Sequence, residues 1–291
     1  MSKFLVTGGA GFIGSHLCDA LLADGNEVVC VDNFNDFYSP LQKESNVSNN
    51  LQNPAYRMYK VDFGDLKAFE QIFKDHKFDA IFHIGARAGV RRSWEEVKDY
   101  VYSNVLGTMN IFEMAKQYGI VAVVYASSST AYGMGAPVPF REDHPIQLFP
   151  SGSPYGATKR STENTALMYA ELFGIKSVGL RLFSVYGPRI RHDLAPWIFT
   201  NAIFRNEPVN ILGSINALRD FTYVGDVVKA FIKAYENMPN LNSKHEIFNV
   251  GNNNPYELKR LVEIIEENLG MKAQINFTAG HHSDPHETRA D

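Results

Sequence analysis

The chain has 291 residues, of which 45% are hydrophobic and 21% are charged, and its formal net charge is −4. This composition is typical of a folded globular protein and excludes intrinsic disorder. There is no basic excess to bind a nucleic-acid backbone and no stretch near the roughly 20 apolar residues of a membrane span, so we expect neither nucleic acid nor a membrane as a partner.

Short β-branched runs alternate with amphipathic segments through the first half of the chain. Such alternation is typical of βαβ units around a parallel sheet. The predicted strands are residues 3–7, 27–32, 56–62, 80–86, 121–127 and 177–183. The predicted helices are residues 14–23, 66–76, 97–118 and 155–173. Right-handed crossovers between these strands predict an α/β fold with a doubly wound parallel (Rossmann) sheet.

The alternation ends after about residue 184, which predicts a smaller α+β lobe over the open edge of the sheet. Its predicted elements are a helix at 197–205 and strands at 209–212 and 219–223. We expect a helix at 226–237 and a strand at 247–250 to return to the main sheet, and a last helix at 256–269 to end at Gly270. The predicted domains are residues 1–183 with 224–250, and residues 184–223 with 251–291.

A glycine triplet, Gly8, Gly11 and Gly14, lies between the first predicted strand and the first predicted helix. The first glycine permits a tight turn, the second lets backbone N–H groups approach a pyrophosphate, and the third packs the helix against the strand. This strand and helix context favours a dinucleotide site over a simple turn.

Asp32 ends the second predicted strand, where a carboxylate can accept both hydroxyl groups of the adenosine ribose. A 2′-phosphate would meet that negative charge, and the neighbouring Asn33 and Phe34 supply no cation. We therefore expect NAD rather than NADP. Asp62, at the end of the third predicted strand, has two open interpretations: it bonds the adenine amino group or caps the helix that begins near Asp65.

Tyr155 and Lys159 lie four residues apart, on one face of a helix that begins after Pro154. The ammonium group, together with a nicotinamide cation, can lower the pKa of the tyrosine and make it a base near neutral pH. The hydroxyl cluster of residues 127–130 follows the carboxyl end of a predicted strand, where doubly wound sheets bind ligands. A serine there can hydrogen-bond the same substrate oxygen, although such clusters also form simple turns.

Five segments, residues 7–14, 127–133, 153–159, 180–189 and 219–221, together resemble the nucleotide-sugar epimerases and dehydratases of the extended short-chain dehydrogenase family. The resemblance covers essentially the whole chain. Residues 83–91 and the segment around Asn104 most resemble UDP-glucuronate 4-epimerases.

The resemblance implies that Ser128, Tyr155 and Lys159 are catalytic. It implies a cofactor site made of Gly8, Gly11, Phe12, Ile13, Gly14, Asp32, Asn33, Asn35, Asp62, Phe63, Ile84, Gly85, Ala86, Asn104, Ser127, Tyr155 and Lys159. The expected substrate contacts are Ala88, Ser128, Ser129, Ser184, Arg189, Arg191, Arg219 and Asp220. It also implies a homodimer built on residues 97–118 and 155–173.

Dehydratases and decarboxylases of this family carry acidic residues directly after the catalytic hydroxyl, where this chain has Ser129 and Thr130. Neither side chain titrates usefully, so we expect 4-epimerisation of a UDP-sugar through a transient 4-keto intermediate. Arg191 can pair with a sugar carboxylate, which favours UDP-glucuronate. It can equally pair with the pyrophosphate or be a solvated surface charge. UDP-glucose and UDP-N-acetylglucosamine, a reductase or dehydratase, and a non-catalytic binding protein remain alternatives.

The C-terminal region departs from the family pattern, because relatives usually continue for a few dozen residues beyond Asp291. We expect a C-terminal truncation. His281, His282 and His286 fit no common metal spacing, and no metal is expected. The short apolar start is not a signal peptide, and Cys18 and Cys30 are expected to be core side chains rather than a disulfide, which predicts a cytoplasmic protein.

Overall fold

Seven parallel strands form the main sheet of the computed structural model, which describes residues 1–280 and 284–291. The strand order is β11-β6-β5-β4-β1-β2-β3. These strands are β1 (Lys3–Thr7), β2 (Glu27–Asp32), β3 (Tyr56–Lys60), β4 (Ala80–His83), β5 (Ala122–Ser128), β6 (Lys176–Leu182) and β11 (His245–Val250). The predicted doubly wound α/β fold is confirmed, and the strand predicted at 247–250 does return to this sheet.

The chain reverses its direction of winding at β1. Successive strands β1, β2 and β3 extend the sheet to one side, while β4 pairs with the other side of β1 and β5, β6 and β11 follow it. In doubly wound sheets the ligand crevice opens at this reversal, outside the carboxyl ends of the strands. The site is therefore expected beyond Thr7, between the segments that follow β1 and β4.

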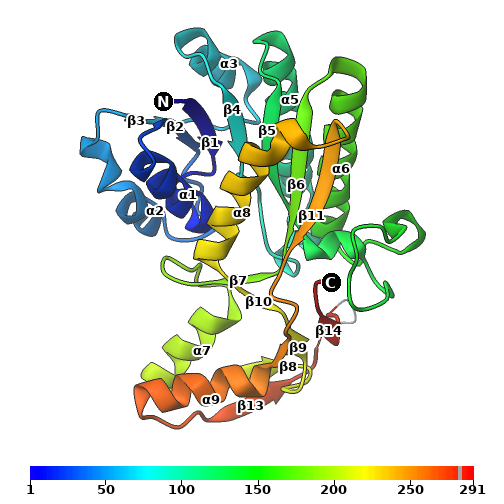
Figure 1. The fold of residues 1–291 in the computed structure, drawn as a ribbon. Helices are drawn as coiled ribbons and strands as arrows, with labels where there is room; N and C mark the ends of the chain where they lie inside the picture. The colour runs from blue at the N-terminus through cyan, green and yellow to red at the C-terminus, as the bar shows by residue number, and fades with distance from the viewer. Residues whose placement is uncertain (281–283) are drawn as a thin grey trace.

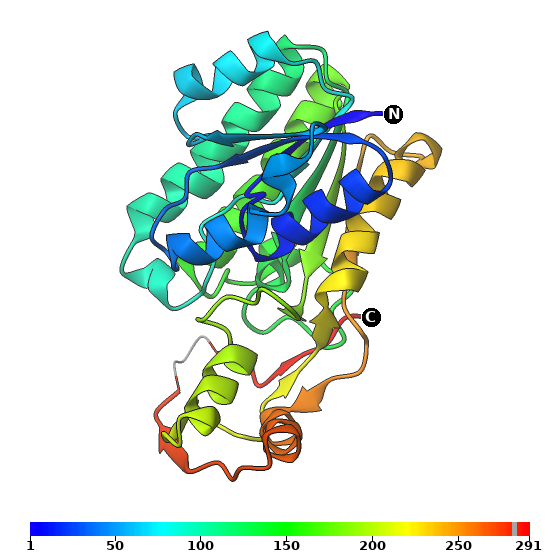
Figure 2. The same ribbon diagram turned by 90° about the vertical axis from the view of Figure 1, so that its left-hand side faces the viewer.

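Side chains alternate between two cores on the two faces of the sheet. Phe4 and Val6 join the core under α1 (Phe12–Ala23) and α8 (Val224–Asn237). Leu5 joins the core under α3 (Leu66–Asp75), α5 (Gly107–Gln117) and α6 (Pro154–Phe173). Figure 2 shows helices on both sides of the sheet. This period of two, buried on both faces, is typical of a parallel sheet between helical layers.

Two helices differ from the sequence prediction. The segment predicted as one helix at 97–118 comprises α4 (Val97–Tyr100), a π-helix (Val101–Leu106) and α5. A further helix, α2 (Pro40–Val47), was not predicted. Ser39 and Pro40, a common N-cap residue followed by proline at the first helical position, are the signal that could have revealed it.

The second lobe lies below the carboxyl edge of the main sheet in Figure 1. It contains α7 (Ala195–Phe204) and α9 (Leu258–Leu269), packed with β8 (Val209–Leu212) and β13 (Ile275–Thr278) around a separate core. The predicted strand 219–223 is in fact two strands of different sheets, β9 (Leu218–Arg219) and β10 (Phe221–Tyr223). Its remaining short strands are β7 (Ser184–Tyr186), β12 (Tyr256–Glu257) and β14 (Glu287–Thr288).

Cys18 and Cys30 are buried, free thiols of the first core, as predicted. Within the described residues, no helix has the length and apolar character needed to span a bilayer. His281 and His282 lie outside the described residues. No cluster of three or more candidate metal ligands occurs in the rest of the chain, which the structure describes.

Candidate active site

The glycine turn between β1 and α1 brings two backbone segments into contact at the carboxyl edge of the sheet. Gly8 has φ +66°, and a Cβ added there would lie 2.6 Å from the Cα of Gly85. A Cβ added at Gly14 would lie 2.2 Å from the carbonyl oxygen of Gly8. Side chains at these positions would push the segments apart. The turn leads into α1 at Gly11, so the N–H groups at the helix start can face a pyrophosphate.

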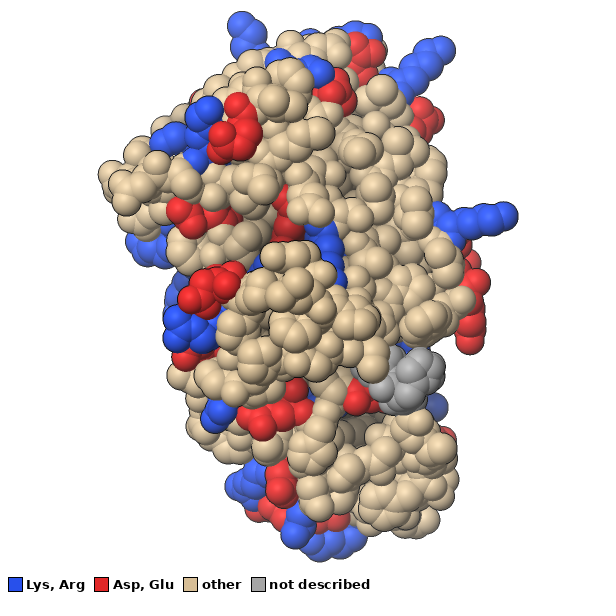
Figure 3. Space-filling model, turned by 90° about the vertical axis from the view of Figure 1, so that its right-hand side faces the viewer, with Lys and Arg blue, Asp and Glu red and all other residues tan. Residues whose placement is uncertain are grey.

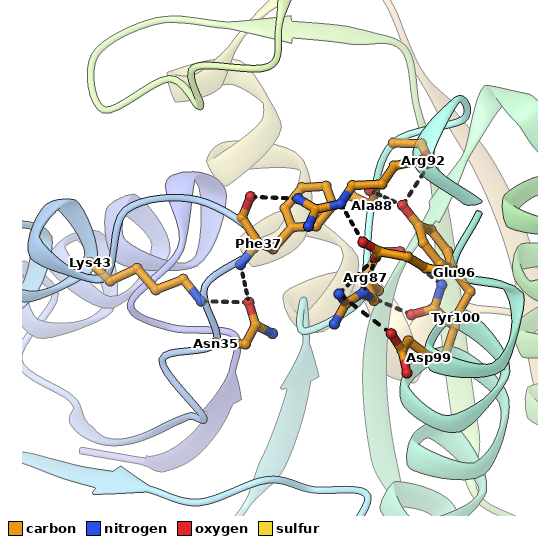
Figure 4. Close-up of polar contacts among 11 residues, drawn as sticks. Asn35, Phe37, Lys43, Arg87, Ala88, Arg92, Glu96, Asp99 and Tyr100 are labelled. Carbon is orange, nitrogen blue, oxygen red and sulfur yellow. Dashed lines mark hydrogen bonds and ion pairs between the residues drawn. The ribbon is translucent and has the colours of Figure 1, made fainter. Parts of the chain in front are cut away.

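Asp32 lies at the end of β2 and is only 5% exposed. Its Oδ1 accepts a hydrogen bond from the backbone N–H of Phe34 at 2.9 Å. Lys43, on α2, donates to the same oxygen at 3.3 Å. It also donates to Oδ1 of Asn35 at 3.3 Å (Figure 4). The buried carboxylate is thus neutralised by a cation that the sequence interpretation missed, since it depends on the unpredicted helix α2.

Asp62 joins the loops that follow β2 and β3. Its Oδ2 accepts from the side chain of Asn33 at 2.9 Å and its Oδ1 accepts from the backbone of Gly64 at 2.8 Å. The alternative that Asp62 caps the next helix is wrong, because Asp65 caps α3 by accepting from Ala68 N at 3.2 Å. Asp62 therefore positions the loop around the pocket.

The helix α6 begins where its sequence predicts. Ser153 caps it, with Oγ accepting from the N–H of Gly156 at 3.0 Å, and Pro154 is at the first helical position. Tyr155 and Lys159 follow on one face. The Nζ of Lys159 donates to the carbonyl oxygen of Ala126 at 2.8 Å and lies 5.9 Å from the centroid of the Tyr155 ring.

Ser128 ends β5 and lines the same cavity as Tyr155. Its Oγ accepts hydrogen bonds from the N–H of Thr130 at 3.2 Å and from the Thr130 hydroxyl at 2.9 Å. These bonds use acceptor capacity of the Ser128 hydroxyl and leave its proton for another oxygen. The turn interpretation and the substrate-binding interpretation of this hydroxyl cluster are therefore compatible.

Burial changes the proton affinities of both catalytic candidates on α6. Burial raises the pKa of Tyr155, while the neighbouring Ser128 hydroxyl and the Arg191 guanidinium lower it in part. Burial lowers the pKa of Lys159 to about 8, and the carboxylate of Glu163 opposes this shift. The protein groups alone therefore raise the pKa of Tyr155, and the predicted lowering, which included a nicotinamide cation, stays a prediction.

A buried ion pair between Arg181 and Glu163 lies next to Ser127, close to the catalytic candidates. Arg181 on β6 donates from Nε and Nη2 to the two carboxylate oxygens of Glu163 at 2.9 and 2.8 Å. The hydroxyl of Ser127 donates to Glu163 at 2.5 Å. Ser127 lines the cavity, but its hydroxyl donates to Glu163. Any cofactor contact of Ser127 would therefore be made by atoms other than the hydroxyl.

Three guanidinium groups surround the ring of Phe37, which lines the cavity, and Figure 4 shows two of them, those of Arg87 and Arg92. The Cζ atoms of Arg87, Arg92 and Arg191 lie 5.9, 4.9 and 5.7 Å from its centroid. Arg92 also donates to the carbonyl oxygen of Phe37 at 3.1 Å, and both Arg87 and Arg92 pair with Glu96. The cluster fixes the loop after β2 against the loop after β4.

Asn104, in the π-helix, holds the loop that follows β4. Its side chain accepts from the N–H of Arg87 at 2.7 Å and donates to the Arg87 carbonyl at 2.9 Å and to Thr158 at 3.0 Å. Asn104 does not line the cavity, so the predicted cofactor contact is corrected to a positioning role. Tyr100 supports the same loop by donating to the carbonyls of Ala88 at 2.5 Å and Gly89 at 2.8 Å.

Three predicted substrate contacts lie away from the cavity. Arg189 pairs with Asp19 of α1 at 2.8 Å. Asp220 is fully buried and accepts from the backbones of Asn252, Asn253 and Ala290, so its assignment as a sugar ligand is wrong. Arg219 donates within the second lobe to the carbonyls of Leu218 at 2.8 Å and His286 at 3.4 Å.

Asp62, predicted as a cofactor contact, is absent from the cavity lining, and the other remaining predicted residues meet in one cavity of about 380 Å³ at the reversal of the sheet. Cofactor-side and sugar-side predictions share its lining: Gly8, Gly11, Phe12, Ile13, Gly14, Asp32, Asn33, Asn35, Phe63, Ile84, Gly85, Ala86, Ala88, Ser127, Ser128, Ser129, Tyr155, Lys159, Ser184 and Arg191. The lining also contains Phe37, Tyr38 and Lys43, for which the sequence pattern gave no signal, and Arg87 and Val90, which belong to the segment 83–91 but were not predicted as contacts.

Known proteins resemble the chain along its full length. Residues 4–251 match the NAD dependent epimerase/dehydratase family. The UDP-glucuronate 4-epimerase of Thermodesulfobacterium geofontis is 35% identical over 100% of this chain and 88% of its own. The UDP-glucuronic acid 4-epimerase of Bacillus cereus, solved with UDP-glucuronic acid and NAD, has a TM-score of 0.90 at 32% identity and covers 99% of this chain and 90% of its own. A UDP-N-acetylglucosamine 4-epimerase from Methanobrevibacter ruminantium, solved with UDP-N-acetylmuramic acid, has a TM-score of 0.87 at 32% identity over 100% of this chain and 89% of its own.

Proposed function

The chain belongs to the NAD dependent epimerase/dehydratase family, and from this premise we propose that it inverts C4 of UDP-glucuronate through a transient 4-keto sugar. The observation that carries the proposal is a single cavity lined by Ser128, Tyr155 and Lys159 together with Arg191. Proton-transfer groups and a carboxylate-binding group are thus side by side.

The residues at the reversal of the sheet fit NAD. Gly8 and Gly14 let the turn pack against backbone atoms with which any side chain would collide, so that the N–H groups at the start of α1 can face a pyrophosphate. Asp32 lines the cavity at the end of β2, where its carboxylate can accept ribose hydroxyl groups. Lys43 is paired with Asp32, which leaves the pair neutral rather than cationic toward a 2′-phosphate. When bound, NAD supplies a hydride acceptor and donor at the sugar C4.

The chain supplies proton transfer and orientation for this reaction. Tyr155, as phenolate, removes the proton of the sugar O4 and later returns it. Ser128 donates a hydrogen bond to the same oxygen, since its acceptor sites are already used by Thr130. Lys159 contributes positive charge near the Tyr155 ring and favours the phenolate.

Ser129 and Thr130 favour epimerisation over the elimination of water or loss of a carboxylate. Both lie in the cavity directly after Ser128, and neither supplies an acid or base near neutral pH. Turnover should therefore proceed with no net change in absorbance at 340 nm, the band of reduced nicotinamide. A reductase would oxidise one reduced nicotinamide at each turnover, so the absorbance at 340 nm would fall.

Arg191 is the residue that favours a uronate among the UDP-sugars. Its side chain is 18% exposed, lines the cavity and lies close enough to Tyr155 to affect its pKa. A guanidinium pairs with a carboxylate through two parallel hydrogen bonds, which a neutral C6 hydroxymethyl group cannot form.

The test of this assignment uses UDP-glucuronate, UDP-glucose and UDP-N-acetylglucosamine, with the C4 configuration followed by NMR. UDP-glucuronate should be favoured by roughly 10- to 200-fold, the scale of a charged hydrogen bond of about 1.5–3 kcal/mol. Arg191→Met should remove this preference and spare the neutral sugars. Equal losses on all three sugars would instead make Arg191 a pyrophosphate ligand and leave an unspecified UDP-sugar as substrate.

Exposed apolar side chains on two adjacent helices support a homodimer. Val97, Val101, Tyr102, Leu106 and Met109 are 40–47% exposed on α4, the π-helix and α5, and Leu172 and Phe173 on α6 are 69% and 50% exposed. The side of the molecule that carries α6 faces the viewer in Figure 3, where a broad uncharged area lies between charged groups. A second copy would cover this surface. A monomeric mass by light scattering at micromolar concentration would contradict the dimer.

We also propose that the protein acts in the cytoplasm. Cys18 and Cys30 are buried free thiols, which suits a reducing compartment. An enzyme that uses NAD as cofactor and a nucleotide sugar as substrate fits the same location.

A further inference from the structure

The guanidinium of Arg191 is already bound by a carboxylate of the protein. Its Nε and Nη2 donate to Oδ1 and Oδ2 of Asp193 at 2.9 and 3.0 Å. This is the two-bond arrangement by which arginine recognises a carboxylate ligand. The hydrogen bonds of Arg191 to described residues use only this edge, so its Nη1 is left for the cavity.

Asp193 lies next to the cavity lining on the sugar side, in contact with lining residues rather than in the lining itself. Its Oδ2 lies 3.6 Å from the position that a Cβ on Gly89 would take, and Gly89 lines the cavity. Its charge reaches the phenol of Tyr155, as does that of Arg191. The side chain of Asp193 is 33% exposed, so solvent reaches the pair and a ligand can compete for it.

The other two guanidiniums on the Phe37 ring have their own anions. Arg87 pairs with Glu96 at 2.7 Å and with Asp99 at 3.6 Å, and Arg92 pairs with Glu96 at 2.6 Å (Figure 4). Arg191 and Asp193 therefore form a separate pair whose charges sum to zero. The positive charge that attracts a uronate depends on how far Asp193 offsets Arg191.

We propose that Asp193 determines how strongly the site distinguishes anionic from neutral sugars, because its carboxylate occupies the recognition edge of Arg191 and offsets its charge. A sugar carboxylate must then bind the remaining Nη1 edge or displace Asp193. The inference rests on the proposed function, since it concerns the same UDP-sugar site. It makes Asp193 a specificity-determining residue rather than a catalytic one.

The substitution Asp193→Asn tests this, because an amide keeps the size and one acceptor oxygen but removes the charge. The ratio of kcat/KM for UDP-glucuronate over UDP-glucose should rise by about tenfold, the effect of one nearby unit charge in a partly hydrated site. The matched control is Asp143→Asn. Asp143 binds Arg141 with the same two-residue spacing and two bonds of 3.0 Å, but both side chains are exposed. The control should leave the ratio unchanged.

The pH profile of kcat/KM shows whether Asp193 acts through its charge or only through its shape. The groups that act on Tyr155 are the Ser128 hydroxyl, the Lys159 ammonium, the Tyr100 phenol, Arg191 and Asp193. Since Asp193 raises the pKa of Tyr155, its removal should lower that pKa. The acidic limb of the pH profile of kcat/KM, measured with the neutral UDP-glucose, should therefore move to lower pH in Asp193→Asn.

Two outcomes would overturn the inference. They are an unchanged ratio of kcat/KM, including an equal loss on both sugars with an unmoved pH profile, and a fall in the ratio toward that of Arg191→Met. A fall in the ratio would mean that Asp193 only holds Arg191 in place. Failure of the proposed function is distinguishable, because it appears in the unsubstituted protein as no C4 inversion of UDP-glucuronate.

Discussion

Two buried lysines face the cavity from opposite ends, and their surroundings differ. Lys43, at the ribose end, and Lys159, at the chemical end, are each 4% exposed. Lys43 has the carboxylate of Asp32 at 3.3 Å. Lys159 donates to a carbonyl oxygen at 2.8 Å and has an aromatic ring 5.9 Å away, with no carboxylate in direct contact among the described residues.

The difference in partners predicts a difference in role. A buried cation with a buried anion stabilises the folded chain only as a pair, and losing either member leaves the other uncompensated. A buried cation without a direct anion is destabilised in its charged form, which is why burial lowers the pKa of Lys159 to about 8. We therefore expect Lys43 to stabilise the folded structure of the site. We expect Lys159 to destabilise the folded state while it favours the phenolate of Tyr155.

The largest effect expected from this comparison is the loss of stability in Lys43→Met. The substitution leaves the carboxylate of Asp32 buried without its cation and should lower the free energy of unfolding by about 3–5 kcal/mol. Urea unfolding of the nucleotide-free protein measures it. The control, Lys229→Met, removes a lysine that is 77% exposed and should change stability by less than about 0.5 kcal/mol.

A double substitution sharpens this prediction. Adding Asp32→Asn to Lys43→Met removes the orphaned charge and should restore part of the lost stability. No recovery would mean that Lys43 supports the loop through packing on Tyr38, whose ring centroid lies 5.1 Å from its Nζ, rather than through the ion pair.

The same two lysines show what the sequence could and could not predict. The role of Lys159 is predictable because Tyr155 and Lys159 have helical spacing and the helix start has clear signals at Ser153 and Pro154. The role of Lys43 is not predictable, because its partner Asp32 lies on another element and no local spacing relates a strand end to a side chain on the next helix. Spacing within one element is encoded locally, whereas contacts between elements depend on the fold.

The sugar side shows the same limit more strongly. Gly8, Asp32 and Ser128 lie at the carboxyl ends of β1, β2 and β5. Because these strands are parallel, the three residues lie at the same edge of the sheet. Asp220 and Arg189 belong to irregular connections, where the backbone direction is set by tertiary contacts. Asp220 binds three backbone N–H groups and Arg189, with φ +62°, turns to α1, so neither reaches the cavity.

A smaller effect on the free energy of unfolding is expected for Lys159→Met. It should raise this free energy, whereas Lys43→Met should lower it. The pKa of Lys159 falls from 10.5 to about 8 on folding, so the unfolded chain binds the proton more tightly. A depressed pKa of this kind removes stability as the pH falls through the interval from about 10.5 to about 8, and the loss is complete below it. The substitution should therefore raise the free energy of unfolding at pH 7, by at most about 3 kcal/mol for a shift of this size.

The gain in Lys159→Met should shrink as the pH rises from 8 to 10, because the folded lysine is then neutral and deprotonating the unfolded lysine costs less as the pH approaches 10.5. Urea unfolding of the nucleotide-free protein at pH 7 and pH 10 measures this change, and Lys229→Met, on the exposed surface, should show no such dependence. Turnover should fall in Lys159→Met by roughly 10²- to 10⁴-fold, the usual scale for disabling a general base. A variant that lost both turnover and stability at pH 7 would instead place Lys159 with Lys43, as a structural cation whose hydrogen bond to Ala126 outweighs its desolvation.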